Sequence, residues 1–239
     1  MKKKSLKIMN IALVVAAGSG SRMKNTQEPK QFVKVNDKPL MIYSLETFNV
    51  HPRIDSIIVV TNEAYIDDVE QLCKQYKLNK VKAVVKGGAT RQESVFHGLE
   101  KAISLSNNKE DIVLIHDAAR PLVSLKIISS NIEKVKECDA VSTVIKASDT
   151  IVSCLDSETI NSIPDRKNLY QAQTPQTFKL AEIYNIHKAN KDNDLATDDA
   201  SLYIKSGKKV YLVEGDRSNF KITTDEDLLM LKGLLNSKR

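Results

Sequence analysis

Tryptophan is absent from this sequence, and aromatic residues of every kind are scarce. Phenylalanine, tyrosine and tryptophan together make up 5% of the 239 residues. Aliphatic side chains must therefore supply most of the hydrophobic core. Hydrophobic residues at 41% and charged residues at 28% exclude a disordered or fibrous chain. We expect one globular domain over residues 11–237, preceded by a basic tail at residues 1–10.

Cysteine is also scarce, which limits the chemistry that thiols can perform. Cys73, Cys138 and Cys154 are far apart, with no CxxC pair and no metal-ligand spacing. This pattern excludes a disulfide scaffold and a zinc-ribbon type of site, and it fits a reducing compartment. No catalytic motif surrounds any of the three, so we do not expect a catalytic cysteine.

Long apolar runs are missing as well. No run approaches the roughly 20 residues that a membrane-spanning helix needs. The opening residues, MKKKSLKIMN, lack the apolar stretch and the cleavage site of a signal peptide. We therefore expect a cytoplasmic protein with no membrane partner.

The charge balance is basic, but the basic residues are dispersed. There are 36 Lys and Arg against 30 Asp and Glu, a net charge of +6. A basic chain can bind nucleic acid, or it can be an enzyme whose substrates are polyphosphates. No basic run is interleaved with aromatic residues, so we expect no nucleic-acid partner and keep a nucleic-acid-binding protein as a lower-ranked alternative.

Apolar, β-branched runs alternate with helical patterns along the chain. We predict strands at residues 11–15, 56–61, 81–85, 112–115, 140–145 and 209–213, and helices at 39–49, 64–76, 90–104, 125–137, 198–206 and 225–235. Strands that are almost wholly apolar are typical of parallel strands covered on both faces. The pattern predicts a Rossmann-like, doubly wound α/β fold with a mostly parallel sheet. Ligands of such sheets bind at the carboxyl ends of the strands.

Residues 148–170 break this alternation. Two short strand candidates, 150–153 and 159–163, flank a polar turn at 154–158, which predicts an inserted β-hairpin arm. A hairpin that packs on nothing is marginally stable. We therefore expect this dimerisation arm to pack against a second subunit and the protein to be a homodimer.

The loop after the first predicted strand has the composition of a phosphate-binding loop. Residues 16–23 read AAGSGSRM, and Gly18 and Gly20 let backbone amides approach an anion. Arg22 and Lys30 add positive charge suited to phosphate. For the glycines alone, an ordinary strand-to-helix turn is the alternative. The last position of GxGxxG is methionine and no GK[ST] follows, which disfavours a dinucleotide-dependent oxidoreductase and a Walker loop.

Three further segments carry polar side chains directly after predicted strands or at the start of a predicted helix. In GGATRQESV, Thr90 and Glu93 form a capping-box pattern, and Arg91 and Ser94 are potential donors.

In HDAARP, Asp117 is suited to Mg²⁺ or to a substrate hydroxyl, and Arg120 to phosphate; an Asp–Arg salt bridge is the alternative. We interpret His116 as structural. Asp198 and Asp199 open a predicted helix, where acidic residues are favoured without any function.

These motifs, in this order, resemble a known family over almost the whole chain. AAGSGSRM followed by PKQF resembles the sugar-nucleotide and alditol-phosphate nucleotidyltransferases. HDAARP and QTPQ are similar to the 2-C-methyl-D-erythritol 4-phosphate cytidylyltransferase family, and ribitol-5-phosphate cytidylyltransferase is a close relative. HDAARP and TDDAS resemble the methylerythritol branch, whereas residues 163–164 and 171–173 resemble the ribitol branch.

The resemblance implies a nucleotide-diphospho-sugar transferase-like fold and a role for each motif. CTP and Mg²⁺ would be bound, and CMP would be transferred to methylerythritol phosphate, in the non-mevalonate isoprenoid pathway, or alternatively to ribitol phosphate for teichoic acid or capsule. The residues that would stabilise charge in the transfer are Arg22, Lys30 and Lys221. Those that would hold CTP are Ala16, Ala17, Gly18, Gly20, Gly88, Ser94 and Asp117. Those that would bind the acceptor are Arg120, Thr150, Arg166 and Thr174, of which Thr150 and Arg166 would reach into the partner subunit.

One position departs from the family pattern. Family members often have an acidic residue where this chain has Ala89. One contact to the base is therefore in doubt, while contacts from the backbone remain possible.

Overall fold

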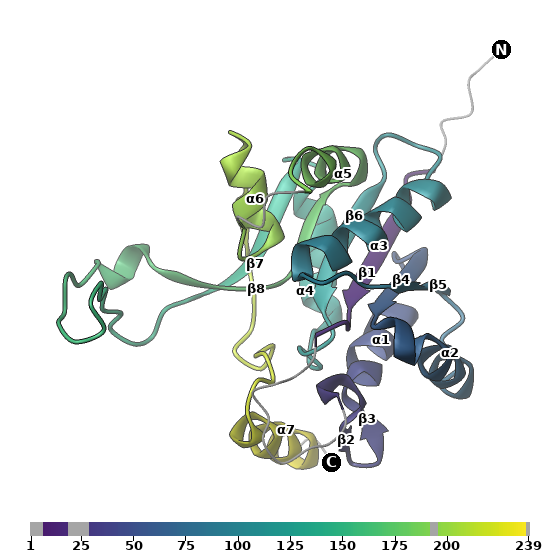
Figure 1. Cartoon of the computed structure of the whole chain (residues 1–239), viewed down its shortest axis with the longest axis horizontal. Coiled ribbons are helices and arrows are strands. Elements are labelled where there is room, and N and C mark those ends of the chain that lie inside the picture. Colours follow the sequence, from purple (N-terminus) through teal and green to yellow (C-terminus); the bar gives the residue numbers. More distant parts are fainter. Residues whose placement is uncertain (1–6, 19–28, 192–195, 238–239) are drawn as a thin grey trace.

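A seven-stranded sheet forms the centre of the protein in this computed structural model, which describes residues 7–18, 29–191 and 196–237 (Figure 1). The strand order is β5-β4-β1-β6-β8-β7-β9. The strands are β1 (Asn10–Val15), β4 (Ser56–Thr61), β5 (Val81–Lys86), β6 (Ile112–Asp117), β7 (Ala140–Lys146), β8 (Tyr170–Lys179) and β9 (Tyr211–Glu214). A separate antiparallel pair is formed by β2 (Lys34–Val35) and β3 (Lys38–Pro39).

The sheet is mostly parallel, as predicted, and β8 is the exception. The pairs β1–β4, β1–β6, β4–β5 and β7–β9 are parallel, whereas β8 runs antiparallel to both β6 and β7. The sequence YQAQTPQTFK of β8 has no apolar run, so the sequence pattern did not reveal it. Its central glutamines and threonines are nevertheless buried and hydrogen-bonded, so β8 is a buried strand with mostly polar side chains.

Helices cover both faces of the sheet. They are α1 (Leu40–Val50), α2 (Ile66–Gln75), α3 (Arg91–Leu105), α4 (Leu125–Lys134), α5 (Leu180–Ala189), α6 (Asp199–Lys205) and α7 (Asp225–Ser237). Side chains of β1 alternate between the two faces. Ala12 and Val14 join one core cluster with residues of α1, α2 and α4, whereas Ile11 and Leu13 join the other with residues of α3 and α5. This is the doubly wound arrangement that the strand pattern predicts.

Helix α3 packs against the sheet at a glycine. A Cβ atom at Gly98 would come within 2.3 Å of Leu13 Cδ1 and 2.8 Å of Val60 Cγ2. A larger residue would force the side chains of Leu13 and Val60 to shift. The close packing fixes the amino terminus of α3 over the carboxyl ends of β1 and β4.

The predicted α-helices and sheet strands are present, with ends shifted by a few residues. The strands and α-helices that were not predicted are β8, α5 and the short pair β2 and β3. The strand predicted at residues 209–213 is observed as β9, Tyr211–Glu214.

The inserted arm projects away from the sheet (Figure 1), but its two predicted strands are wrong. A single antiparallel bridge between Ser153 and Ser162 stands in their place. At the tip, the Asp156 carboxylate accepts hydrogen bonds from the backbone N–H groups of Glu158 and Thr159, which closes the turn. No other part of the described chain flanks the arm to extend its ladder, so the pairing stays short.

A buried histidine braces the end of β6 against β8. His116 is fully buried; its Nδ1 lies 3.0 Å from Thr174 Oγ1, and its Nε2 lies 3.0 Å from the Arg120 carbonyl oxygen. Burial lowers the pKa of His116 to about 4, although hydrogen bonds to Arg120 and Thr174 oppose the shift. The ring is therefore neutral at pH 7, and the structural interpretation of His116 is confirmed.

The lowered pKa of His116 predicts a stability loss in mild acid. Because its pKa in the folded protein lies below its ordinary 6.5, the unfolded chain binds the proton first as the pH falls. The free energy of unfolding should decrease from about pH 6.5 towards pH 4, by about 2 kcal/mol at pH 5. Urea unfolding of the wild type and of His116→Gln at pH 7.5 and 5 measures this. The variant should be less stable at pH 7.5 but less sensitive to pH; equal sensitivity would contradict the assignment.

Candidate active site

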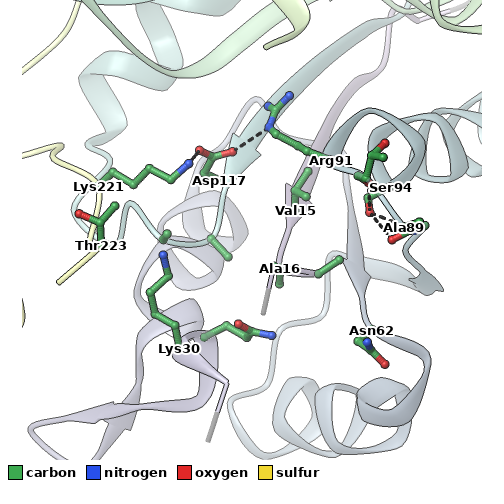
Figure 2. Close-up of a pocket in the computed structure, with 17 residues that line it drawn as sticks. Val15, Ala16, Lys30, Asn62, Ala89, Arg91, Ser94, Asp117, Lys221 and Thr223 are labelled. Carbon is green, nitrogen blue, oxygen red and sulfur yellow. Dashed lines mark hydrogen bonds and ion pairs between the residues drawn. The ribbon is translucent and has the colours of Figure 1, made fainter. Parts of the chain in front are cut away.

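A pocket of about 590 Å³ opens at the carboxyl ends of the parallel strands (Figure 2). The loops that follow β1, β4, β5 and β6 all contribute to it, as expected for a doubly wound sheet. Its lining residues are Val15, Ala16, Ala17, Gly18, Lys30, Gln31, Asn62, Gly88, Ala89, Thr90, Arg91, Ser94, Asp117, Ala118, Ala119, Lys221 and Thr223.

The pocket brings together most of the predicted site residues that the structure describes. Eight of them line it: Ala16, Ala17, Gly18, Lys30, Gly88, Ser94, Asp117 and Lys221. Gly20 and Arg22 lie outside the described residues. Arg120 and Thr174 do not line it; Thr174 Oγ1 accepts from the Asp117 N–H, and Arg120 Nη1 donates to the Asn219 carbonyl oxygen. Thr150 and Arg166 are exposed on the arm and do not line the pocket of their own chain.

The glycine loop after β5 packs directly against the loop after β1. A Cβ atom at Gly87 would come within 2.6 Å of Ala17 Cβ and 2.9 Å of Ser94 Oγ. The N–H of Gly88 donates to Ser94 Oγ at 3.0 Å, and that hydroxyl donates to the Thr90 carbonyl oxygen at 2.9 Å. Gly88 and Ser94 therefore form one fixed corner of the pocket.

One of the two hydrogen bonds of the predicted capping box is present at the start of α3. Thr90 is the N-cap, and its hydroxyl accepts from the N–H of Glu93 at 3.1 Å. The Glu93 carboxylate accepts from the N–H of Ala89 at 2.7 Å, one residue before the cap. This bond occupies the backbone N–H of the residue where the family often has an acidic side chain.

Asp117 is the one carboxylate among the described lining residues, and two cations flank it (Figure 2). Lys221 Nζ donates to Asp117 Oδ2 at 2.7 Å, and Arg91 Nε lies 3.5 Å from Oδ1. Burial alone would raise the pKa of Asp117, but the charges of Arg91 and Lys221 outweigh it and hold the pKa well below its usual range. Asp117 is therefore an anion at neutral pH.

Lys30 and Lys221 approach the pocket from the same side. Lys30, in the short 3-10 helix Lys30–Phe32, donates through Nζ to the carbonyl oxygen of Ile222 at 2.6 Å. Since Ile222 follows Lys221, this bond places both ammonium groups beside one stretch of backbone. With Arg91, they give the described lining three cations against one carboxylate, which suits a polyanionic ligand.

A set of buried polar bonds holds the segment that carries Lys221. Asn219 Nδ2 donates to Gln173 Oε1 at 3.1 Å and to the Thr174 carbonyl oxygen at 2.9 Å. Arg120 donates from Nη1 to the Asn219 carbonyl oxygen and from Nη2 to that of Ala172, at 2.9 and 3.2 Å. These hydrogen bonds hold the loop after β9 against β8.

Sequence reasoning missed one feature next to the pocket. Asp199 was given only a helix-start role, but its side chain is 1% exposed and contacts Arg91 and His187. Asp198, in contrast, is the N-cap of α6, with a capping box to Ser201. Two acidic residues at a helix start have a common structural explanation, and only the ion pair of Asp199 with Arg91 sets it apart from Asp198, whose Oδ2 accepts from Gln176 Nε2.

The described residues contain no other obvious catalytic centre. Among them, no three His, Cys, Asp or Glu side chains gather in a way that would hold a metal ion. Burial raises the pKa of Cys73 to about 11, so this thiol is not a nucleophile at neutral pH. No helix in the described part of the chain is long and apolar enough to cross a membrane.

Comparisons with known proteins agree with this geometry. The family model described as "IspD: 2-C-methyl-D-erythritol 4-phosphate cytidylyltransferase" matches residues 10–237. The chain is 42% identical to a protein of that name from Clostridium acetobutylicum, over 95% of this chain and 97% of the relative. It is 37% identical to a ribitol-5-phosphate cytidylyltransferase from Streptococcus agalactiae serotype Ia, over 96% and 97%.

Solved structures show the same likeness. A 4-diphosphocytidyl-2C-methyl-D-erythritol synthase from Anaerococcus prevotii superposes with a TM-score of 0.82 at 28% identity, covering 96% of each chain. The Francisella tularensis 2-C-methyl-D-erythritol 4-phosphate cytidylyltransferase gives a TM-score of 0.78 at 28% identity, covering 94% of this chain and 99% of the other. The chain therefore belongs to the IspD family and is a CTP-using cytidylyltransferase.

Proposed function

We propose that this enzyme transfers CMP from CTP to 2-C-methyl-D-erythritol 4-phosphate and releases pyrophosphate. The observation that carries the proposal is the pocket itself, whose described lining has three cations, Lys30, Arg91 and Lys221, and a single carboxylate, next to a glycine-lined corner. The cations suit a triphosphate and a second phosphate, and the corner suits a flat base.

The two ends of CTP fit different parts of this pocket. The cytosine is assigned to the corner of Gly88 and Ser94, which line the pocket side by side and can contact a flat ring through backbone and hydroxyl groups. The triphosphate is assigned to Ala16, Ala17 and Gly18 at the end of β1. Backbone N–H groups at the end of this strand are suited to phosphate oxygens. By family resemblance, Gly20 and Arg22 continue this loop.

The reaction is an in-line displacement at phosphorus. An oxygen of the acceptor phosphate attacks the α-phosphorus of CTP, a new P–O bond forms, and the bond to the β-phosphate oxygen breaks with release of pyrophosphate. The nucleophile is already an anion, so no general base is required. The work of the protein is to position the two phosphates and to stabilise negative charge, which we assign to Lys30, Lys221 and Arg22.

A divalent cation fits this site only as a partner of the substrate. Asp117 is the single carboxylate of the described lining, and Mg²⁺ in phosphoryl-transfer sites commonly uses one or two carboxylates plus substrate phosphates and water. Asp117 would hold the cation, and the cation would supply charge neutralisation at the phosphates.

We base the choice of acceptor on two motifs, HDAARP and TDDAS, which both contact Arg91. HDAARP contributes Asp117 and TDDAS contributes Asp199, and the Arg91 guanidinium contacts both, at 3.5 and 2.8 Å. Both motifs resemble the methylerythritol branch. Ribitol 5-phosphate is the second candidate, because relatives of that name are also similar over the full length and because residues 163–164 and 171–173, where the arm returns to the sheet, resemble theirs.

We propose further that two chains share each site. The arm presents exposed apolar side chains that nothing in the described chain covers: Ile151, Val152, Leu155, Ile160 and Ile163, 42% to 83% exposed. Apolar groups on a projecting arm are typical of a subunit interface. Thr150 and Arg166 lie on this arm, and in a homodimer they would bind the acceptor phosphate in the partner's pocket together with Arg120 and Thr174.

The acceptor is tested by comparing the two alditol phosphates in separate assays. Purified enzyme with CTP and Mg²⁺ is given each alditol phosphate, and pyrophosphate release is measured. We expect kcat/KM for methylerythritol phosphate to exceed that for ribitol phosphate about 10-fold or more, since the two differ in a branch and in chain length. The reverse order would assign the enzyme to the ribitol branch, and no pyrophosphate with either would overturn the proposal.

Removing a charge from the phosphate site should slow the transfer. Lys30→Ala, Lys221→Ala and Arg22→Ala should each lower kcat about 100-fold or more, because a preorganised donor to the transition state is lost. The control is Lys74→Ala, an exposed lysine of α2 outside the pocket. Circular dichroism checks folding. Near-normal turnover in a folded Lys30→Ala enzyme would remove that residue from the mechanism.

The shared site predicts complementation between two inactive variants. Lys30→Ala damages the pocket and Arg166→Ala damages the arm, so each homodimer should be nearly inactive. After mixing and subunit exchange, about half of the dimers are mixed, and each has one intact site, so about a quarter of wild-type activity should return. Light scattering measures the oligomeric state. A monomer, or no recovery despite proven exchange, would contradict the shared site.

A further inference from the structure

A chain of buried contacts leads from helix α5 to the reaction centre. His187 on α5 contacts Asp199 at the start of α6, Asp199 contacts Arg91 at the start of α3, and Arg91 contacts Asp117 at the end of β6. The four residues come from four different helices and strands, of which α5 and α6 are consecutive in the chain. Of the four, Asp117 and Arg91 line the pocket, and His187 and Asp199 do not.

We propose that Asp199 and His187 are positioning residues for the transfer reaction, which act through Arg91 on the carboxylate of Asp117. The inference rests on the proposed use of Asp117 in substrate binding. It assigns a function to a part of the protein that lies behind the pocket and touches no substrate.

The first argument is the unequal sharing of Arg91. Its Nη2 lies 2.8 Å from Asp199 Oδ2, a hydrogen bond, whereas its Nε lies 3.5 Å from Asp117 Oδ1, an ion pair without hydrogen-bond geometry. The guanidinium is thus held primarily by Asp199. Asp117 Oδ1 is therefore held less tightly than Oδ2, which accepts from Lys221 at 2.7 Å.

The second argument is that Asp199 stays charged inside the protein. Burial would raise the pKa of Asp199, but the charge of Arg91 and the hydrogen bond to His187 outweigh it and lower the pKa to about 2. A buried carboxylate held as an anion attracts Arg91 strongly at this short distance. Four charges of alternating sign result, in the order Lys221, Asp117, Arg91 and Asp199.

The third argument is the placement of His187. Its side chain is 1% exposed, and its Nε2 lies 3.1 Å from Asp199 Oδ1. Its Nδ1 is buried, with no hydrogen-bond partner among the described residues. The Nε2–H can donate to this carboxylate oxygen. His187 fixes the carboxylate plane of Asp199, so the second oxygen keeps facing Arg91.

Loss of this support has a defined consequence in the pocket. Without the charge of Asp199, Asp117 becomes the remaining carboxylate in contact with Arg91, and the guanidinium closes on Oδ1. Asp117 is then clasped by Arg91 and Lys221 together, which lie on either side of it in Figure 2. A substrate hydroxyl or a hydrated cation would have to break that pair before binding.

The test uses variants that change charge or hydrogen bonding with little change in shape. Asp199→Asn removes the charge, His187→Leu removes the donor, and His187→Gln keeps a donor near the Nε2 position. All are assayed for pyrophosphate release with CTP and whichever alditol phosphate the wild type uses. The inference is therefore judged separately from the choice of acceptor.

We expect a split between turnover and nucleotide binding. Asp199→Asn and His187→Leu should lower kcat about 10-fold to 100-fold, because a small misplacement at a transfer site has effects of this size. The Kd for CTP measured without Mg²⁺ should change little, because the corner of Gly88 and Ser94, to which the cytosine is assigned, is untouched. His187→Gln should recover most of the loss. Unchanged kcat in folded Asp199→Asn, or equal losses in the leucine and glutamine variants, would overturn the proposal.

Matched controls separate positioning from general destabilisation. Asp111→Asn changes a fully buried carboxylate at the opposite end of β6, bonded to Met9 N and Ser106 Oγ. His51→Leu removes a buried histidine, 1% exposed, that contacts Ser129. Both should lower Tm and leave kcat of the folded enzyme near the wild-type value. Losses of kcat as large as those of the test variants would mean that the effect is only structural.

A double-mutant cycle tests the path through Arg91. If Asp199 acts through Arg91, then Asp199→Asn should lower kcat much less in an Arg91→Gln background than in the wild type. The double variant also replaces the buried ion pair by a neutral amide pair, which favours folding. Additive losses would show that Asp199 acts by another route and would overturn the proposal. If Arg91→Gln alone does not fold, the comparison of kcat between His187→Leu and His187→Gln decides the question.

Discussion

The ion pairs around Asp117 are the interaction on which this site depends. A buried carboxylate is costly unless cations and donors surround it, and Asp117 is held by Lys221 at 2.7 Å and by Arg91 at 3.5 Å. Those cations also face the pocket. The groups that stabilise the buried charge are therefore the groups that a polyphosphate meets. The protein prepares its electrostatic environment before a substrate arrives, which is how preorganised sites reduce the cost of charge development.

The topology of the sheet brings these three charged residues together. Asp117 ends β6, Arg91 begins α3, and Lys221 follows β9, so the sheet must place distant segments at one edge. Strand β8 completes this arrangement from between β6 and β7. Thr174 Oγ1 accepts from the Asp117 N–H at 3.1 Å, and the Thr174 carbonyl oxygen accepts from Asn219. A polar strand in the middle of the sheet thus fastens both the carboxylate and the lysine loop.

Local sequence predicted the parts of the site that depend on local geometry. The glycine loop after β5 and the Asp117 motif follow buried strands, and strand ends at one edge of a sheet converge whatever the side chains are. The cap at Thr90 was also predictable from its spacing to Glu93. The doubly wound sheet follows from the apolar runs. In each case the signal lies close in sequence to the feature that it predicts.

The features that were missed depend on contacts between distant segments. Strand β8 has no apolar period, because its buried glutamines and threonines are satisfied by partners such as Asn131 and Asp198, far away in the chain. Asp199 resembles an ordinary acidic helix start until α3 and α5 are packed beside it. The arm was placed correctly, but its strands were overestimated, because β-branched residues favour a strand only where a neighbour pairs with them.

The chemistry assigned to the site explains why buried titratable groups outside the charge cluster are inert. A phosphate nucleophile needs no proton removed, so a histidine or cysteine poised near pH 7 would add nothing, and burial shifts the pKa of His116 and of Cys73 away from neutrality in opposite directions. Specificity must then come from shape and from where the cations lie. In the proposed dimer the body of the chain binds the nucleotide, and the arm of the partner completes the acceptor site. On this view, a change of acceptor requires substitutions on the arm and at its return to the sheet, while Asp117 and its supporting charges stay the same.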